Sequence, residues 1–198
     1  QNMQDFNYNF GDRYIPVQNI ELCFRIYTDE NVYTPDPEHL TVTKTDQGLL
    51  VTSNYYASAG LQCIRDGRFE ARIVFAENDE IQCQINAQLD ARIKGTAMRV
   101  RYIPKGDLPL KYYRFKPYEE VISKVTPQDF HYPEPLFHPG FIMRYPGPNY
   151  FYVMSDDVEV REKLFEIHDH EHGVILDCHH YESAGTWARN QETPIWRI

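Results

Sequence analysis

The chain has 198 residues, of which 42% are hydrophobic, and its formal net charge is −9. This length allows one large domain or two small ones to bury a substantial core. An acidic chain does not match the phosphates of nucleic acid, which require a surface rich in Lys and Arg. No run of residues approaches the roughly 18 apolar residues of a membrane-spanning helix. We therefore expect neither a nucleic-acid partner nor a membrane partner.

The first half of the chain alternates apolar and polar residues, a pattern typical of half-buried strands. Turn residues separate the alternating runs, and Asp66-Gly67 is the strongest hairpin signal among them. Many short strands without a helical period predict an all-β fold, an antiparallel sandwich or barrel, which we interpret as a single β-sandwich domain over residues 1–198. The alternating runs lie at residues 20–27, 40–44, 48–53, 69–75, 81–89 and 98–102.

Residues 104–148 differ from the rest because they are dense in proline and aromatic residues. We expect most of this excursion to be an ordered loop that crosses a sheet. One short helix is predicted near residues 118–125, with Pro117 at its start and Glu119 and Glu120 in its first turn. Strands are expected again at residues 141–145 and 150–154.

Residues 164–181 contain five of the eight histidines and predict a β-hairpin that turns near Gly173. Neighbours on one strand face lie about 6.5 to 7 Å apart, and cross-strand partners about 5 Å. Such imidazoles suit Zn or Cu, whereas the alternative is a solvated hairpin tip without an ion. The candidate metal ligands are His168, His170, His179 and His180.

An acidic turn precedes the hairpin at Asp156-Asp157, with Glu159 close by. Its oxygen ligands would suit a structural Ca²⁺ ion, although the spacing is not that of a dedicated calcium loop and a solvated turn is the alternative. The four cysteines show no Cys-x-x-Cys spacing, so a structural zinc knuckle is not expected. The sequence thus defines no certain cofactor.

Residues 48–75, GLLVTSNYYASAGLQCIRDGRFEARIVF, resemble the early strands of concanavalin A-like jelly rolls, especially laminarinase-type glycoside hydrolases and related glycan-binding domains. In those proteins a Gly-Leu-x-Val/Ile strand, a Tyr-x-Ser-Gly-Leu turn and a Gly-Arg-Phe-Glu-Ala-Arg strand follow in that order. The resemblance implies a jelly-roll sandwich and a carbohydrate partner. If the protein is an enzyme, the resemblance implies that it is a glycoside hydrolase or polysaccharide lyase.

The hydrolases of this kind place a Glu, an Asp and a Glu on one strand face. The nearest string here is Glu166-Ile-His-Asp169-His-Glu171, in which Glu166 faces away from the other two carboxylates unless a bulge intervenes. The retaining mechanism, which needs two carboxyls about 5 to 5.5 Å apart, is therefore not carried over. The candidate catalytic residues are Glu166, Asp169, Glu171 and His179.

Aromatic faces can pack against the apolar faces of sugar rings, and Arg can bind their hydroxyl groups. The alternative for each aromatic residue is a core or loop anchor, and residues 195–198 also fit a final strand. The candidate substrate-binding residues are Tyr112, Tyr132, Tyr150, Tyr152, Trp187, Arg189 and Trp196.

Three functions remain open from the sequence. The first is a carbohydrate-recognising module or a fragment of a polysaccharide-degrading enzyme, for which a secreted or periplasmic location is expected. The second is a metal-dependent cupin-like enzyme that uses the histidine hairpin. The third is a structural or assembly domain that docks onto other domains or chains through its aromatic loop. The sequence contains no Gly-Lys-Ser/Thr phosphate loop and no Gly-x-Ser-x-Gly elbow, which disfavours nucleotide chemistry and serine hydrolysis.

Overall fold

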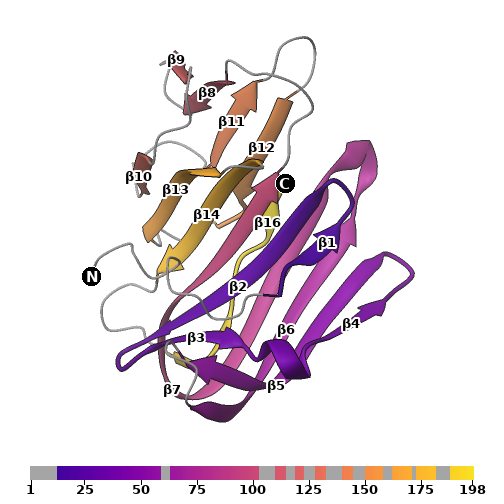
Figure 1. Cartoon of the computed structure of the whole chain (residues 1–198), viewed down its shortest axis with the longest axis vertical. Coiled ribbons are helices and arrows are strands. Elements are labelled where there is room, and N and C mark those ends of the chain that lie inside the picture. Colours follow the sequence, from indigo (N-terminus) through magenta and orange to yellow (C-terminus); the bar gives the residue numbers. More distant parts are fainter. Residues whose placement is uncertain are drawn as a thin grey trace.

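The computed structural model describes residues 13–58, 63–102, 110–114, 119–122, 128–132, 140–144, 150–157, 162–170, 173–181 and 188–198. These residues form sixteen strands (Figure 1), and every recorded strand pairing is antiparallel. The strands are β1 Ile15–Val17, β2 Ile20–Thr28, β3 Val32–Pro35, β4 Thr41–Lys44, β5 Gly48–Ser58, β6 Ile64–Phe75, β7 Ile81–Tyr102, β8 Leu110–Arg114, β9 Glu119–Ile122, β10 Gln128–Tyr132, β11 Gly140–Arg144, β12 Tyr150–Ser155, β13 Glu162–His170, β14 Gly173–Tyr181, β15 Ala188–Glu192 and β16 Trp196–Arg197.

Five strands close into a ring in the order β2, β3, β5, β6 and β7. The ring closes because β7 is 22 residues long. Its first half pairs with β6 and its second half with β2. Closing a sheet on itself removes two exposed edges, which stabilises an all-β chain against pairing with other chains. The interior of the ring holds most of the buried hydrophobic core, including Phe24, Val51 and Phe69.

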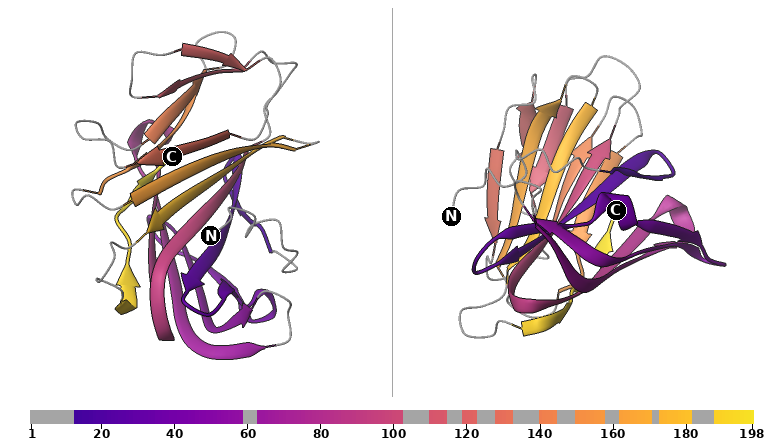
Figure 2. Two further views of the ribbon diagram at one scale, coloured as in Figure 1. Left: turned by 90° about the vertical axis from the view of Figure 1, so that its left-hand side faces the viewer. Right: turned by 60° about the horizontal axis from the view of Figure 1, so that its bottom comes forward.

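Outside the ring, β1 pairs with β2 and β4 pairs with β5, while the later strands extend the sheet from the free side of β7. Its second half pairs with β14, which pairs with β13 and through it with β10. Its first half pairs with β15 and β16, and β16 continues through β12 and β11 to β8 and β9. Figure 2 shows β8 to β14, in red-brown to orange, gathered at one end of the molecule, and the ring strands, in indigo to magenta, at the other end together with β15, in yellow.

Strand β2 is buried on both faces, although its alternation predicts a half-buried strand. One face lines the ring, and the other packs in a small cluster with Cys23, Tyr27 and Ala97. Arg25 lies on this second side and is fully buried. Its Nη1 donates hydrogen bonds to the Phe24 carbonyl at 3.1 Å and to Thr34 Oγ1 at 3.2 Å, which offsets part of the desolvation cost.

The all-β prediction is confirmed, and most predicted strands are present, but the predicted helix near 118–125 is wrong. Glu119–Ile122 forms β9, which pairs with β8. The β-branched pair Val121 and Ile122 favours extended backbone, and strand pairing overrides the helix-start signal of the two glutamates. The loop expected over 104–148 is also wrong in part, since β8, β9 and β10 lie within it, whereas β11 and β12 match the strands expected at residues 141–145 and 150–154. The division into two stacked jelly-roll sheets stays a prediction.

The hairpin signal at Asp66-Gly67 is not a turn, because β6 runs through both residues without interruption. A Cβ atom at Gly67 would lie 2.5 Å from Tyr56 Cε2 and 2.6 Å from the Gln88 carbonyl oxygen. Close packing of neighbouring groups therefore explains this glycine. The chain turns between β6 and β7 through the 3-10 helix η3, Glu77–Asp79. Asn78 and Asp79 both have a φ of 61° there.

The described residues contain no α-helix, only η3 and a second 3-10 turn, η2, at Pro37–His39. Nowhere in this part of the chain is a helix both long enough and apolar enough to cross a bilayer.

Candidate functional site

The solvent-facing side of β5, β6 and β7 carries ordered rows of polar side chains. On β7, Ile81 to Leu89 alternate between buried apolar residues and partly or fully exposed polar ones. The β6–β7 register places each polar residue of β7 opposite one that shares its side on β6. We call this surface the polar face, and it consists of Thr52, Arg68, Glu70, Arg72, Gln82, Gln84, Asn86 and Gln88.

The β6 row is charged. Glu70 lies between two arginines, with its carboxylate oxygens 3.2 Å from Arg68 Nη2 and 3.2 Å from Arg72 Nη2. The arginine side chains are 67% and 66% exposed, so each pair is worth only about 0 to 1 kcal/mol. A ligand can therefore recruit these guanidinium groups at little cost.

The β7 row consists of amides. Each amide offers a carbonyl acceptor and two N–H donors. Two of the four are held in place: Gln82 Nε2 donates to Glu80 Oε1 at 2.9 Å, and Gln84 Nε2 donates to the Thr193 carbonyl at 3.1 Å. Directly opposite groups on neighbouring strands lie about 5 Å apart. The polar face therefore presents hydrogen-bonding groups at a regular spacing.

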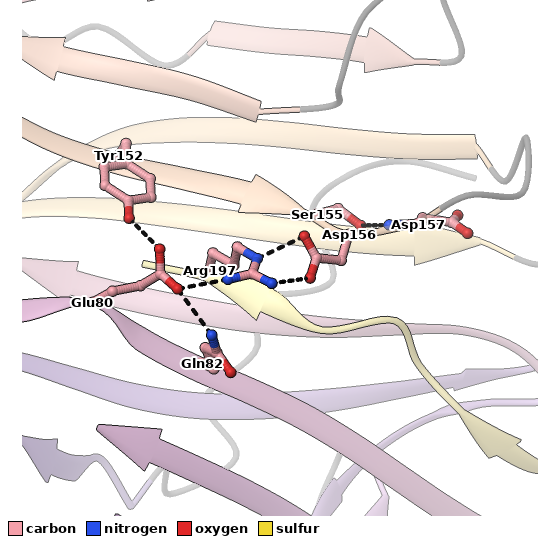
Figure 3. Close-up of polar contacts among 7 residues, drawn as sticks. All are labelled: Glu80, Gln82, Tyr152, Ser155, Asp156, Asp157 and Arg197. Atoms are coloured by element: carbon pink, nitrogen blue, oxygen red, sulfur yellow. Dashed lines mark hydrogen bonds and ion pairs between the residues drawn. The ribbon is translucent and has the colours of Figure 1, made fainter. Parts of the chain in front are cut away.

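A polar network adjoins the face where β16 lies between β7 and β12 (Figure 3). Arg197 lies opposite Gln82 on β7. It donates through Nε to Asp156 Oδ1 at 2.7 Å, and its Nη2 lies 2.7 Å from Asp156 Oδ2. Its Nη1 donates to Glu80 Oε1 at 2.7 Å. We call Glu80, Gln82, Tyr152, Asp156 and Arg197 the Arg197 network. Its bidentate pairing fixes the plane of the guanidinium group.

The hydrogen bonds of this network set the protonation of its members. Partial burial alone would raise the pKa of Glu80, but hydrogen bonds from Gln82, Tyr152 and Arg197 hold that pKa below its usual value. Burial, together with donation to Glu80 Oε2 at 2.5 Å, raises the pKa of Tyr152 to about 12. At neutral pH Glu80 is therefore an ionised acceptor and Tyr152 a neutral donor.

Three of the predicted substrate-binding residues lie around β7, in different environments. Tyr152 belongs to the Arg197 network. Arg189 is 74% exposed and pairs with Asp90 at 2.8 Å. Trp196 is fully buried in β16, the final strand that the alternative for residues 195–198 predicts. Strand pairing places Trp196 opposite the buried Cys83, so the indole of Trp196 points toward the core.

The other predicted substrate-binding residues are spread over separate strands. Tyr112 lies in β8 opposite Met143, and Tyr150 lies in β12 opposite Arg144, so both belong to the strands that extend from β16. Tyr132 lies in β10, which joins the sheet through β13 instead. Trp187 lies outside the described residues. The described residues of this set therefore lie on β8, β10, β12, β15 and β16.

The histidine hairpin forms as β13 and β14, with His170 opposite Gly173. His179 and His180 face opposite sides of β14. The ring centroid of His179 lies 5.7 Å from that of Tyr27, whereas His180 Nε2 lies 2.7 Å from Ser155 Oγ. His179 is opposite Leu164, four residues from His168, or roughly 13 Å along the strand. The two histidines of β14 therefore point away from each other, and the described residues contain no group of three His, Cys, Asp or Glu that could hold a metal.

Among the predicted catalytic residues, Glu166 and Asp169 face opposite sides of β13, because they are three positions apart on one strand. Glu166 lies in β13 opposite Asp177, and Asp169 lies opposite Val174. His179 is only 2% exposed. Glu171 lies outside the described residues.

The two aspartates proposed for calcium pair with cations of the protein. Asp156 binds Arg197, and Asp157 Oδ2 lies 2.5 Å from Lys163 Nζ, which is buried. These ion pairs compensate the carboxylate charges that a calcium site would use. Glu159 lies outside the described residues.

The polar face was visible in the sequence only as an alternation, because Gln82, Gln84, Asn86 and Gln88 stand at every second position. Their amide character is the signal that distinguishes this strand from an ordinary charged solvent face. The Arg197 network has no local signal, since Arg197 and Glu80 are 117 positions apart.

Comparison of the chain with protein-family models gives no match, and comparison with curated protein sequences gives none either. The function therefore rests on the chemistry of the polar face.

Proposed function

We propose that this protein is a carbohydrate-recognising module that binds its ligand on the polar face. The observation that carries the proposal is the register of the β7 amides beside the charged β6 row. A sugar presents neighbouring hydroxyl groups, each of which donates and accepts hydrogen bonds. Amide, carboxylate and guanidinium groups can satisfy such hydroxyls in pairs. Neighbouring strands supply these groups at intervals of about 5 Å.

The Arg197 network supports the proposal because it is ordered before any ligand arrives. Arg197 uses Nε and Nη2 toward Asp156 and Nη1 toward Glu80, so its side chain has little freedom left to lose. Immobilising a flexible side chain on binding costs about 0.5 to 1.5 kcal/mol, a cost that preorganised groups avoid. Tyr152 adds an aromatic side chain with a neutral hydroxyl donor at the edge of the network.

The same network favours binding over hydrolysis. A glycosidase needs a carboxylic acid that stays protonated near neutral pH, with a raised pKa. The pKa of Glu80 is shifted in the opposite direction. The guanidinium of Arg197 also pairs with Glu80 and stabilises the charged form of that carboxylate. A recognition module, separate or part of a larger polysaccharide-degrading enzyme, fits these groups better than a hydrolytic centre.

The resemblance of residues 48–75 to concanavalin A-like jelly rolls adds support. In this range, β5 and β6 are adjacent strands of the ring, and both carry residues of the polar face. The strands that resemble those of glycan-binding domains are therefore strands of the proposed site. A jelly-roll arrangement of the whole chain belongs to this proposal.

A glycan array followed by isothermal titration calorimetry tests the proposal. We expect the protein to bind at least one neutral oligosaccharide and the double variant Asn86→Ala/Gln88→Ala to bind it about tenfold more weakly, equivalent to about 1.4 kcal/mol. The control variant is Asp29→Ala, an exposed residue after β2 that lies outside the polar face. Absence of binding to every glycan on the array would refute the proposal, as would equal losses in the double variant and the control.

A further inference from the structure

The turn between β4 and β5 borders a hollow at the β5–β6 end of the polar face. The hollow has a volume of about 380 Å³, within the range of about 300 to 1,000 Å³ of small-molecule sites. Its lining residues are Thr45, Asp46, Gln47, Leu50, Arg72 and Val74.

The lining combines an apolar part with a polar part. Leu50 and Val74 lie in β5 and β6, where Leu50 is directly opposite Arg72. Thr45, Asp46 and Gln47 belong to the turn and are exposed. A pyranose ring likewise has apolar C–H faces and a rim of hydroxyl groups. The two kinds of lining therefore match the two kinds of surface on one sugar unit.

The turn is held firmly in place. The Thr45 N–H donates to the Gly48 carbonyl at 2.9 Å, and the Phe75 N–H donates to the Gln47 carbonyl at 2.8 Å. A Cβ atom at Gly48 would lie only 2.1 Å from the Ile73 carbonyl oxygen, so glycine allows β5 to approach β6 closely here. Within the described part of the chain, the side chains of Asp46 and Gln47 make no hydrogen bond or ion pair. Both are free to bind a ligand from a fixed backbone.

The hollow and the Arg197 network lie on one row across the sheet. Gly48 is opposite Val74, Val74 is opposite Gln82, and Gln82 is opposite Arg197. The row crosses from β5 through β6 and β7 to β16. With strands about 4.8 Å apart, these three steps span roughly 14 Å. A ligand that contacts both ends must be longer than a single sugar unit.

The charges along this row define the kind of chain that fits. In the Arg197 network, the charges of Glu80, Asp156 and Arg197 sum to −1. In the hollow, Arg72 pairs with Glu70 and the carboxylate of Asp46 has no ion-pair partner among the described residues, so the charges of these three groups also sum to −1. Both ends of the row therefore carry an excess negative charge, which disfavours uronate or sulfate groups there. In contrast, the carboxylate oxygens can accept hydrogen bonds that sugar hydroxyl groups donate.

We infer that the hollow is the terminal subsite for a neutral oligosaccharide that lies across the strands from Asp46 and Gln47 to the Arg197 network. This inference rests on the proposed function and specifies the ligand's class, its direction on the sheet and the position of one end. It predicts that affinity grows with chain length until the ligand spans both ends of the row.

Calorimetric titrations with cello-, laminari- and manno-oligosaccharides, from the monosaccharide to the hexasaccharide, test the length dependence. For the series that binds, we expect the tetrasaccharide to bind at least tenfold more tightly than the disaccharide. Oligogalacturonides of equal length should bind at least tenfold more weakly. Equal affinity at all lengths, or a preference for the uronates, would overturn the inference. No binding of any of these three neutral series would also overturn the inference, and the glycan array decides separately on the proposed function.

The variant Asp46→Ala/Gln47→Ala tests the hollow itself. Both residues are exposed, so the melting temperature should match that of the wild type. We expect the tetrasaccharide to lose its tenfold advantage over the disaccharide in this variant, while Asp29→Ala retains it. The comparison with Asn86→Ala/Gln88→Ala separates the two proposals. If that variant loses binding while Asp46→Ala/Gln47→Ala keeps the full length dependence, the polar face stands and the terminal subsite is refuted.

Discussion

The imidazole of His180 stacks on the indole of Trp196, with ring centroids 4.1 Å apart and ring planes 11° apart. Both side chains are fully buried, and His180 Nε2 also lies 2.7 Å from Ser155 Oγ. The three residues come from β14, β16 and β12, so the stack joins strands that are not all direct neighbours. Arg197 follows Trp196 and faces the opposite side. The buried stack therefore anchors the residue that organises the polar network.

The first prediction concerns this anchor. Replacing Trp196 with Ala should lower the free energy of unfolding by about 3 to 5 kcal/mol, because it leaves a large cavity in the core. Chemical denaturation measures the loss. Arg189→Ala removes an exposed residue close in sequence and should change stability by less than about 0.5 kcal/mol. Similar losses in the two variants would contradict the buried placement of Trp196.

The second prediction concerns the buried ion pair of Arg99 and Asp177. Arg99 Nε and Nη2 donate to the two carboxylate oxygens at 2.7 and 2.9 Å. Arg99→Met leaves a buried carboxylate without this partner and should cost about 3 to 5 kcal/mol. The double variant Arg99→Met/Asp177→Leu should recover most of that loss, since no buried charge of the pair remains. Urea denaturation of both variants checks this, and a double variant no more stable than the single one would argue against it.

The third prediction concerns pH and Glu80. Because the pKa of Glu80 is lower in the folded protein than in the unfolded chain, its contribution to stability is complete above the unfolded pKa of about 4.3. It is lost as the pH falls through the lower folded pKa. Glu80→Gln should therefore be less stable than the wild type above about pH 5, and this difference should shrink in acid. Urea denaturation across this pH range measures it, and a difference that stays constant would exclude the proposed linkage.

The fourth prediction concerns thiol reactivity. All four cysteines are free, and Cys63 is the exposed one. Burial raises the pKa of Cys83 to about 12 and also raises the pKa of Cys178. Only thiolates react rapidly, so a thiol reagent should label one cysteine quickly in the native protein and all four in denaturant. Cys63→Ser should abolish the fast phase, and a fast phase that persists in this variant would show that a buried cysteine is accessible.

The fifth prediction separates packing from turn formation at Gly67. Gly67→Ala places a methyl group against Tyr56 and the Gln88 carbonyl and should cost about 1 to 3 kcal/mol. Asp66→Ala alters the exposed neighbouring residue and serves as the matched control. Thermal unfolding of both variants decides the question. Full stability of Gly67→Ala would mean that β5 and β6 are less closely packed there than the structure has them.

The sequence by itself determined the strands of the first half and the histidine hairpin. Alternation is a local property, because successive side chains of a strand point to opposite faces, and the runs at residues 20–27, 69–75 and 81–89 accordingly became β2, β6 and β7. The alternating amides of the polar face can be read from the sequence for the same reason. Local signals failed where pairing competed with them, as in β9, where two glutamates after a proline indicated a helix.

Only the tertiary structure decided which groups meet. Alternation separates the two sides of a strand, but it does not say what covers each side. The sequence allowed Trp196 to be either a sugar-binding residue or part of a final strand. The pairing of β16 with β7 places Trp196 opposite Cys83 on the buried side and Arg197 on the other side, where it contacts Glu80. His179 and His180 are adjacent in sequence yet contact different clusters. Contacts between residues far apart in the sequence depend on strand order and register, which no local pattern specifies.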